Sequence, residues 1–114
     1  TRDGTCERDF IHVSDLAHAH SLSTEKIDEL KSYQVFNIGT GFGTTVLELI
    51  SRFEDVTGVK INKKFVARRM GDVAQSVANV DLARQLLGFK LRYSIDDMCR
   101  DAWLWHSNDK KLES

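Results

Sequence analysis

The sequence predicts an α/β fold, and three patterns carry that prediction. Short apolar runs alternate with longer amphipathic stretches, in the order strand, helix, strand, helix, strand, helix, helix. Glycines stand where two of these helices are expected to end. Hydrophobic residues make up 41% and charged residues 29% of the 114 residues, which is typical of a globular chain. No repeat, low-complexity segment or linker divides residues 1–114, so we expect a single unit.

The first predicted strand is "FIHV" (residues 10–13), which is short, apolar and β-prone. Asp15 follows it and can cap a helix. The inner side of that helix is expected to carry Leu16, Ala17, Ala19 and Leu22. Polar residues take over at "SLSTEKIDELKS", which marks the end of the helix and leaves room for a second helical turn or a surface loop.

The clearest helix follows a second predicted strand at residues 35–38 and a glycine turn at residues 39–43. Thr45 and Glu48 have the spacing of a capping box, in which each side chain accepts a backbone N–H of the other. An apolar stripe of helical period comprises Val46, Leu49, Ile50, Phe53 and Val56. Gly58 then stands where a left-handed C-cap is expected.

The remaining elements are a strand and two helices. "KINKKFVA" (residues 60–67) alternates as a strand does, and Asp81 can cap the short helix "LARQLLG", which Gly88 ends. Ser94 and Asp97 repeat the capping-box spacing before a last helix. Its expected core residues are Ile95, Met98, Cys99, Ala102 and Trp105. A few short strands need cover on both faces, so the chain is expected to be one part of a larger α/β structure.

Charge and cysteine content exclude several classes of protein. The net charge of −1 argues against nucleic acid or an acidic membrane surface as the main partner. No apolar run approaches the ~18 residues of a spanning helix. Cys6 and Cys99 lack metal-type spacing and are expected to be free thiols in a reducing cytosol, with a single disulfide as the alternative. The chain begins at Thr1 in a polar stretch and has no proline, so we expect it to belong to a longer polypeptide.

Two charged motifs are candidates for a binding site. In "VARRMGDVAQS", Arg68 and Arg69 stand close to Asp72, either as a solvated turn with a local Arg–Asp pair or as an arginine fork on a diphosphate. In the second case the aspartate would accept from a ribose hydroxyl. Arg8 and Asp9 form either a salt bridge or loop-ordering contacts, or they aim the arginine into a cleft at the end of the sheet. Local chemistry does not separate these readings.

Two further motifs favour structural interpretations. "GTGFG" (residues 39–43) looks like a dinucleotide loop, but Thr44 stands where a third glycine or alanine is required. We therefore expect a strand-to-helix turn rather than a phosphate site. His12 lies between apolar residues and is expected to be a buried, hydrogen-bonded histidine rather than a metal ligand.

Four stretches taken together resemble the carboxyl-terminal portion of the UDP-glucose 4-epimerases, members of the extended short-chain dehydrogenase/reductase superfamily. They are "DGTCERDFIHVSDLAHAH", "FNIGTGFGTTVLELISRFEDVTG", "ARRMGDVAQSVANVDLARQLLGFK" and "DDMCRDAWLWHS". The ending "MCRDAWLWHS" separates this family from many other nucleotide-sugar epimerases. The resemblance runs from Asp3 to about Ser107.

The resemblance implies an isomerase of galactose metabolism that interconverts UDP-glucose and UDP-galactose, with UDP-GlcNAc and UDP-GalNAc as further candidate substrates. In that family a Rossmann domain binds NAD and a smaller domain binds the substrate. The chain is similar to the substrate-binding domain and the last crossovers, without the NAD-binding part. The resemblance also implies a cytoplasmic enzyme that is a homodimer at full length. The alternative is a non-catalytic remnant that binds nucleotide sugars.

By this resemblance, Arg8 and Arg69 hold the UDP diphosphate, Asp72 binds the uridine ribose and Arg68 supports the loop. Ser76 lines the sugar pocket, where a small residue leaves room for an N-acetyl group. No catalytic residue is assigned, because the chain contains neither the family's Gly-rich NAD loop nor its Tyr-x-x-x-Lys pair. The chain departs from the usual family residues at Cys6, Phe10 and Met70.

Overall fold

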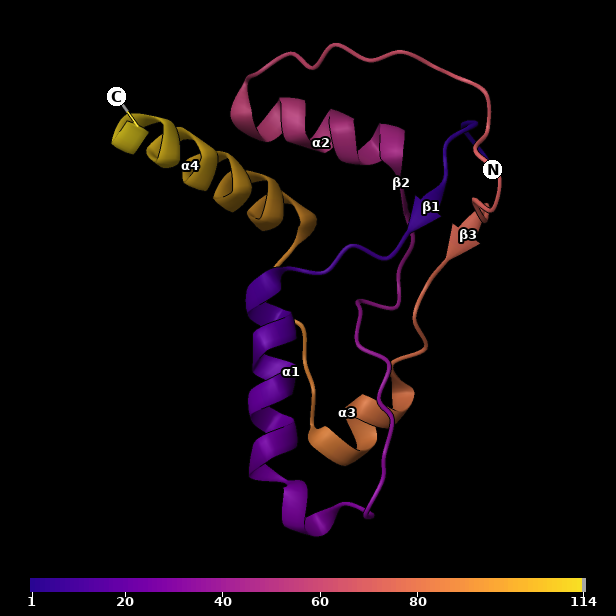
Figure 1. Ribbon diagram of the computed structural model, residues 1–114, viewed down its shortest axis with the longest axis vertical. Coiled ribbons are helices and arrows are strands. Elements are labelled where there is room, and N and C mark those ends of the chain that lie inside the picture. Colours follow the sequence, from indigo (N-terminus) through magenta and orange to yellow (C-terminus); the bar gives the residue numbers. More distant parts are fainter. Residues whose placement is uncertain (114) are drawn as a thin grey trace.

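A computed structural model describes residues 1–113, with side chains placed through Asp109. Its elements are β1 (Glu7–Arg8), α1 (Val13–Glu25), the 3-10 turn η1 (Ile27–Glu29), β2 (Thr44–Thr45), α2 (Val46–Thr57), β3 (Gln75–Ser76), α3 (Asp81–Leu87) and α4 (Ile95–Glu113). Figure 1 shows α1 beside α3 and α2 beside α4, with the small sheet at the start of α2. No helix within residues 1–113 is long and apolar enough to cross a membrane.

The sheet has the strand order β2–β1–β3. Helices lie between its strands along the sequence, as the predicted α/β class requires. Strand β1 is antiparallel to β2 and parallel to β3, and the parallel pair requires the long crossover through α1 and α2. The segment between Gly58 and Ala74 arches over α2 before it reaches β3 (Figure 1). In the register of the parallel pair, Arg8 lies opposite Ser76.

The predicted strands at 10–13, 35–38 and 60–67 are wrong, because none of these segments forms a ladder. The apolar alternation of the second segment is nevertheless real, since Phe36 and Ile38 pack on the core while Val35 is exposed. Apolar patterning reports which side chains are buried, whereas a strand also needs a neighbouring backbone to pair with. These segments have no such neighbour in residues 1–113.

Helix α1 starts at a histidine cap rather than at Asp15. The Nδ1 atom of His12 accepts the N–H of Ser14 at 3.0 Å, so in the neutral ring Nε2 carries the proton and donates to the Asp101 carboxylate at 2.7 Å. The ring also stacks on Tyr93, with 4.4 Å between centroids. His12 is therefore the buried structural histidine that the sequence predicts.

Asp15 is fully buried within the first turn of α1 and has a tertiary role instead of the predicted cap. Its carboxylate accepts the backbone N–H of Arg92 at 3.1 Å and that of Tyr93 at 3.2 Å. These bonds fix the segment that leads into α4 against α1.

The capping boxes are confirmed. Thr45 Oγ1 accepts the N–H of Glu48 at 3.1 Å, and the Glu48 carboxylate accepts the N–H of Thr45 at 2.9 Å. Ser94 and Asp97 exchange the same two bonds at 2.8 and 3.2 Å before α4. Gly58 ends α2 in the left-handed conformation, with φ of 71°.

Helix α3 also ends as predicted, at a left-handed Gly88 with φ of 66°. Its start differs from the prediction, because Asp81 is the first helical residue and the capping position belongs to Val80, without a side-chain cap. Both cysteines are free, as expected, and burial raises the pKa of the Cys99 thiol.

The core lies between α1, α3 and the segments beside them. Its buried members are Ala19, Ala83, Leu87 and Phe89, and the partly buried residues around them are Ile11, Leu22, Leu30, Phe36, Ile38 and Leu91. Helices α2 and α4 pack through Phe53 and Trp103, whose rings meet edge to face at 5.9 Å. The predicted inward positions Leu16, Ala17, Ala102 and Trp105 are wrong, since all four are exposed.

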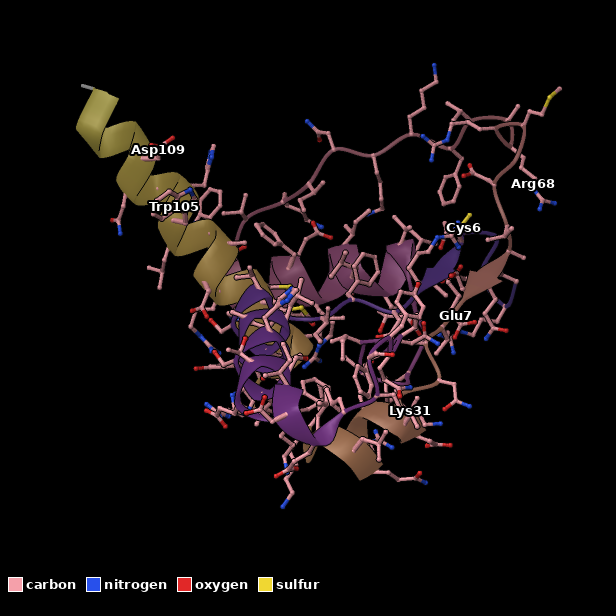
Figure 2. The ribbon with its side chains drawn as sticks, turned by 60° about the horizontal axis from the view of Figure 1, so that its bottom comes forward. Cys6, Glu7, Lys31, Arg68, Trp105 and Asp109 are labelled. Atoms are coloured by element: carbon pink, nitrogen blue, oxygen red, sulfur yellow. The ribbon has the colours of Figure 1, made fainter. Side chains whose placement is uncertain are left out.

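Large apolar side chains remain open to solvent on several elements. Figure 2 shows Trp105 on the part of α4 that extends beyond the other helices, and 76% of this residue is exposed. Other exposed apolar residues are Val13, Tyr33, Phe42, Phe65, Val66 and Met70. Such surface in a small α/β piece normally packs against further structure.

We therefore expect the 114-residue polypeptide alone to fold marginally or not at all, because it buries too little apolar surface to offset its chain entropy. Scanning calorimetry of the purified polypeptide tests this. A single cooperative transition with the enthalpy typical of this length, about 80 kcal/mol, would contradict the expectation.

Candidate functional site

The four predicted site residues lie on β1 and on one segment that ends in β3. Arg8 and Ser76 are direct partners in the parallel register. The N–H of Glu7 donates to the Ala74 carbonyl at 2.8 Å, and the N–H of Asp9 donates to the Ser76 carbonyl at 3.2 Å. The ladder thus brings together two parts of the site that are far apart in the sequence.

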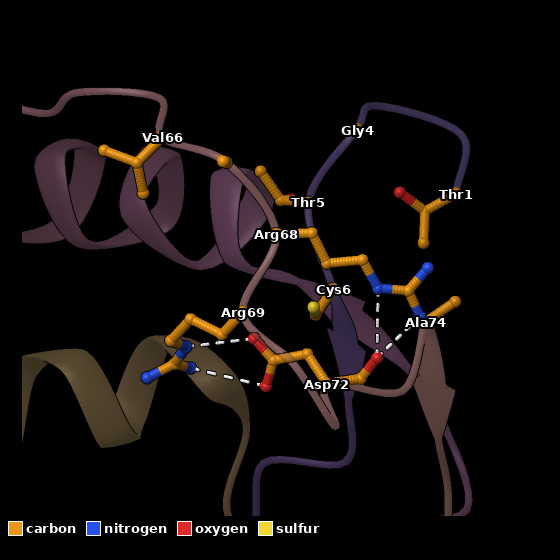
Figure 3. Close-up of a pocket in the computed structure, with 10 residues that line it drawn as sticks. Thr1, Gly4, Thr5, Cys6, Val66, Arg68, Arg69, Asp72 and Ala74 are labelled. Atoms are coloured by element: carbon orange, nitrogen blue, oxygen red, sulfur yellow. Dashed lines mark hydrogen bonds and ion pairs between the residues drawn. The ribbon is translucent and has the colours of Figure 1, made fainter.

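The "RRMGD" turn closes on itself around Asp72 (Figure 3). Arg69 forms a two-point pair with the Asp72 carboxylate, at 3.0 Å from Nε and 3.5 Å from Nη2. Arg68 donates from Nε at 3.1 Å and from Nη2 at 2.6 Å to the Asp72 backbone carbonyl. Gly71 supplies the positive φ of 87° that the turn needs. The local Arg–Asp pair, one of the two readings of the sequence, is present. Among the described residues, both guanidinium groups use Nε and Nη2 for these bonds, so their Nη1 groups can still bind a ligand.

A cavity of about 320 Å³ opens beside this turn. It is lined by Thr1, Gly4, Thr5, Cys6, Val66, Ala67, Arg68, Arg69, Asp72 and Ala74. The Arg69 side chain is 84% exposed, so an anion can reach it without any unfolding. Asp3 anchors the facing loop by accepting the N–H of Thr5 at 2.9 Å and the hydroxyl of the fully buried Thr45.

A second cavity, of about 540 Å³, contains the other two predicted residues. It is lined by Arg8, Asp9, Phe36, Asn37, Ile38, Ser76, Val77, Ala78 and Asn79. Among the residues that the structure describes, the Arg8 guanidinium donates only to the neighbouring Glu7 carbonyl, from Nη1 at 2.9 Å, which leaves most of its fork available. The segment 69–76 therefore contributes Arg69 and Asp72 to one cavity and Ser76 to the other.

Asp9 has a larger role than its place in the sequence indicates. Its carboxylate accepts the hydroxyl of Thr40 at 2.5 Å and the N–H groups of Thr40 at 2.8 Å, Gly41 at 2.9 Å and Ala78 at 3.2 Å. Partial burial opposes ionisation, but these hydrogen bonds together hold the pKa of the Asp9 carboxyl below its usual range. Of the alternatives for this residue, the loop-ordering role is the one the structure supports.

The glycine turn at 39–43 does not fit the pyrophosphate of a dinucleotide. The N–H groups that would face a phosphate already donate to Asp9, and the N–H of Thr45 donates to Glu48. A Cβ at Gly39 would lie 2.5 Å from the Asp9 carboxylate, and one at Gly43 would collide with the Glu7 carboxylate. Carboxylates surround the turn, so glycine serves close packing here and the predicted strand-to-helix turn is confirmed.

Comparison with known proteins gives one consistent family. The family described as "NAD dependent epimerase/dehydratase family" matches residues 1–39. UDP-glucose 4-epimerase 2 of Arabidopsis thaliana is 46% identical over 110 residues, which are 96% of this chain and 31% of that protein. The human UDP-glucose 4-epimerase is 43% identical over 109 residues, again 96% of this chain and 31% of the relative.

Solved structures agree with the sequence matches. A UDP-glucose-4-epimerase from Stenotrophomonas maltophila, with bound NAD and formylated UDP-arabinopyranose, superimposes with a TM-score of 0.94 at 45% identity, covering 98% of this chain and 33% of that one. The enzyme from Bifidobacterium longum in complex with NAD+ and UDP gives 0.86 at 38% identity, over 96% and 32%. The chain thus spans about a third of the length of these relatives. Residues 1–39 match the NAD dependent epimerase/dehydratase family, and nearly all of the chain is similar to one part of the UDP-glucose 4-epimerases.

Proposed function

We propose that this chain is the UDP-sugar-binding portion of a UDP-glucose 4-epimerase, in which Arg8, Arg69, Asp72 and Ser76 contact the substrate. The observation that carries the proposal is the parallel β1–β3 pair. It sets Arg8 opposite Ser76 at the second cavity, and the segment that enters β3 presents Arg69 and Asp72 beside the first cavity.

The chemistry of these side chains suits a nucleoside diphosphate sugar. Two guanidinium forks can each bind phosphate oxygens with two parallel hydrogen bonds. Arg69 is paired with Asp72 in the unliganded turn, so binding exchanges this pair for a phosphate contact. The released Asp72 carboxylate can then accept a ribose hydroxyl. Arg68 holds the carbonyl of Asp72 and so keeps the turn in shape during the exchange.

The proposed reaction interconverts UDP-glucose and UDP-galactose. NAD supplies hydride transfer in such enzymes. The glycine turn of this chain does not fit NAD, so we assign its binding to a separate amino-terminal Rossmann domain of the full-length enzyme. Both similar structures contain bound NAD, and the one from Bifidobacterium longum also contains UDP, which supports both ligands for the whole enzyme. We further propose that this enzyme is a cytoplasmic homodimer.

The 114-residue polypeptide alone is expected to have no epimerase activity, because its sequence contains no Tyr-x-x-x-Lys pair to act on the 4-hydroxyl. The assay mixes the polypeptide with UDP-galactose and NAD and measures UDP-glucose. Turnover above the protein-free blank would contradict the prediction.

The test of the proposed function uses the polypeptide that contains this chain at the full length of its relatives. That enzyme should convert UDP-galactose to UDP-glucose. Failure to do so, together with retained binding of UDP-sugars, would favour the alternative of a non-catalytic remnant. The coding sequence upstream of Thr1 gives an independent answer, since a Gly-rich loop and a Tyr-x-x-x-Lys pair support the enzyme and an adjacent start codon supports the remnant.

A further inference from the structure

Asp9 joins three segments that meet at the second cavity. One carboxylate oxygen accepts both the N–H and the hydroxyl of Thr40, and the other accepts the N–H groups of Gly41 and Ala78. These partners lie 31, 32 and 69 residues from Asp9 along the chain. A single side chain thus ties the end of β1 to the glycine turn and to the segment after β3.

Asp9 contacts the backbone at two points between Ser76 and Ala78. Its backbone N–H donates to the carbonyl of Ser76 at 3.2 Å, and its carboxylate accepts the N–H of Ala78 at 3.2 Å. Gly39 has no side chain where the carboxylate and Ala78 approach, so this arrangement has little room to relax. The backbone of residues 76–78 is therefore held at two points next to Arg8.

We propose that Asp9 is a positioning residue that fixes one wall of the sugar pocket, residues 76–78 with the Ser76 side chain, relative to Arg8. It thereby sets how sharply the site discriminates sugars by size. This inference rests on the proposed function, because it needs Ser76 to face the sugar. Ser76 excludes a larger substrate only if its backbone cannot move away. Asp9 restricts that movement through its bonds to the Ser76 carbonyl and to the Ala78 N–H.

Asparagine cannot replace this carboxylate even though it has the same shape. All of the Asp9 partners are donors, and an asparagine has one acceptor oxygen and one NH₂ group. In one orientation the NH₂ group faces the donors of Gly41 and Ala78, and in the other it faces the N–H of Thr40. Either way at least one backbone N–H loses its partner and the clamp loosens.

The experiment measures kcat/KM for UDP-GalNAc and for UDP-galactose in the full-length enzyme and takes their ratio. Asp9→Asn is combined with Ser76→Tyr, because a bulky wall shows clearly whether the wall is held in place. Ser76→Tyr alone should lower the ratio. Adding Asp9→Asn should raise it again by about three- to tenfold, the coupling expected for groups in contact. A loss of folded enzyme cannot produce this result, since it cancels in the ratio.

Asp97→Asn in the same Ser76→Tyr background is the matched control. Asp97 also accepts several hydrogen bonds, from the N–H and hydroxyl of Ser94 and from Arg100, but it lines neither cavity. It should leave the ratio unchanged. Thr40→Val removes the hydroxyl that donates to Asp9, together with its bonds to the Phe42 backbone, and keeps the three backbone N–H donors of the Asp9 carboxylate. It should shift the ratio in the same direction as Asp9→Asn.

An identical ratio in the Ser76→Tyr enzyme with and without Asp9→Asn overturns the proposal. If the Asp9→Asn variant does not fold, an unchanged ratio with Thr40→Val overturns the proposal instead. If Ser76→Tyr has no effect by itself, Ser76 is not a wall and the inference fails with it. A wild-type enzyme without epimerase turnover instead overturns the proposed function, so the two failures are distinguishable.

Discussion

Replacing Arg69 with alanine is expected to weaken UDP-sugar binding to the full-length enzyme by about 2–4 kcal/mol, or about 30- to 900-fold in Kd. The reason is the loss of a charge-assisted fork to a diphosphate. The variant no longer has to give up the Arg69–Asp72 pair of the unliganded turn, but that exposed pair contributes little, so the lost phosphate contact dominates. Isothermal titration with UDP measures the change directly.

Arg68→Ala is the matched control, because it removes the adjacent guanidinium. Arg68 is bound to the Asp72 carbonyl through two hydrogen bonds, so its loss should loosen the turn without removing a ligand contact. We expect a clearly smaller decrease in affinity. Equal decreases, or a larger one at Arg68, would show that the roles of the two arginines are reversed.

Replacing Ser76 with tyrosine is expected to lower turnover of UDP-GalNAc selectively. Serine is small, so the wild-type pocket should admit the N-acetyl group as well as the plain hexoses. A tyrosine fills that space, and overpacking of about 1–3 kcal/mol corresponds to a loss of about 5- to 150-fold in kcat/KM. Turnover of UDP-galactose should be retained, because its 2-hydroxyl needs no such room.

The measurement compares both substrates in wild-type enzyme and in the Ser76→Tyr variant. Ser76→Ala is the size control, since it keeps the pocket open and removes only the hydroxyl, and it should behave as wild type toward UDP-GalNAc. A wild-type enzyme that ignores UDP-GalNAc would refute the open pocket. Parallel losses for both substrates would show a general disturbance of the site.

Helix ends in this chain could be predicted because their determinants are local. Thr45 with Glu48, and Ser94 with Asp97, satisfy each other's backbone groups across three residues, and Gly58 needs only its own freedom to adopt positive φ. The "RRMGD" turn is local as well, and its Arg–Asp pair was one of the two readings open from the sequence. Such features depend on neighbours that the sequence places together.

Tertiary structure alone decided where the chain pairs and which polar groups are buried. Strands formed at 7–8, 44–45 and 75–76, rather than in the more apolar runs, because pairing requires a second backbone that local pattern does not supply. The same holds for the four hydrogen bonds of Asp9 and for the burial of Asp15 against the segment before α4. The sequence by itself determined the α/β class, the helix caps and the candidate arginines, since each rests on residue type and short spacing. Arg8 and Ser76 lie opposite each other because β1 pairs in parallel with β3, and most of the chain separates these two strands in the sequence. Only the folded backbone can specify such a pairing.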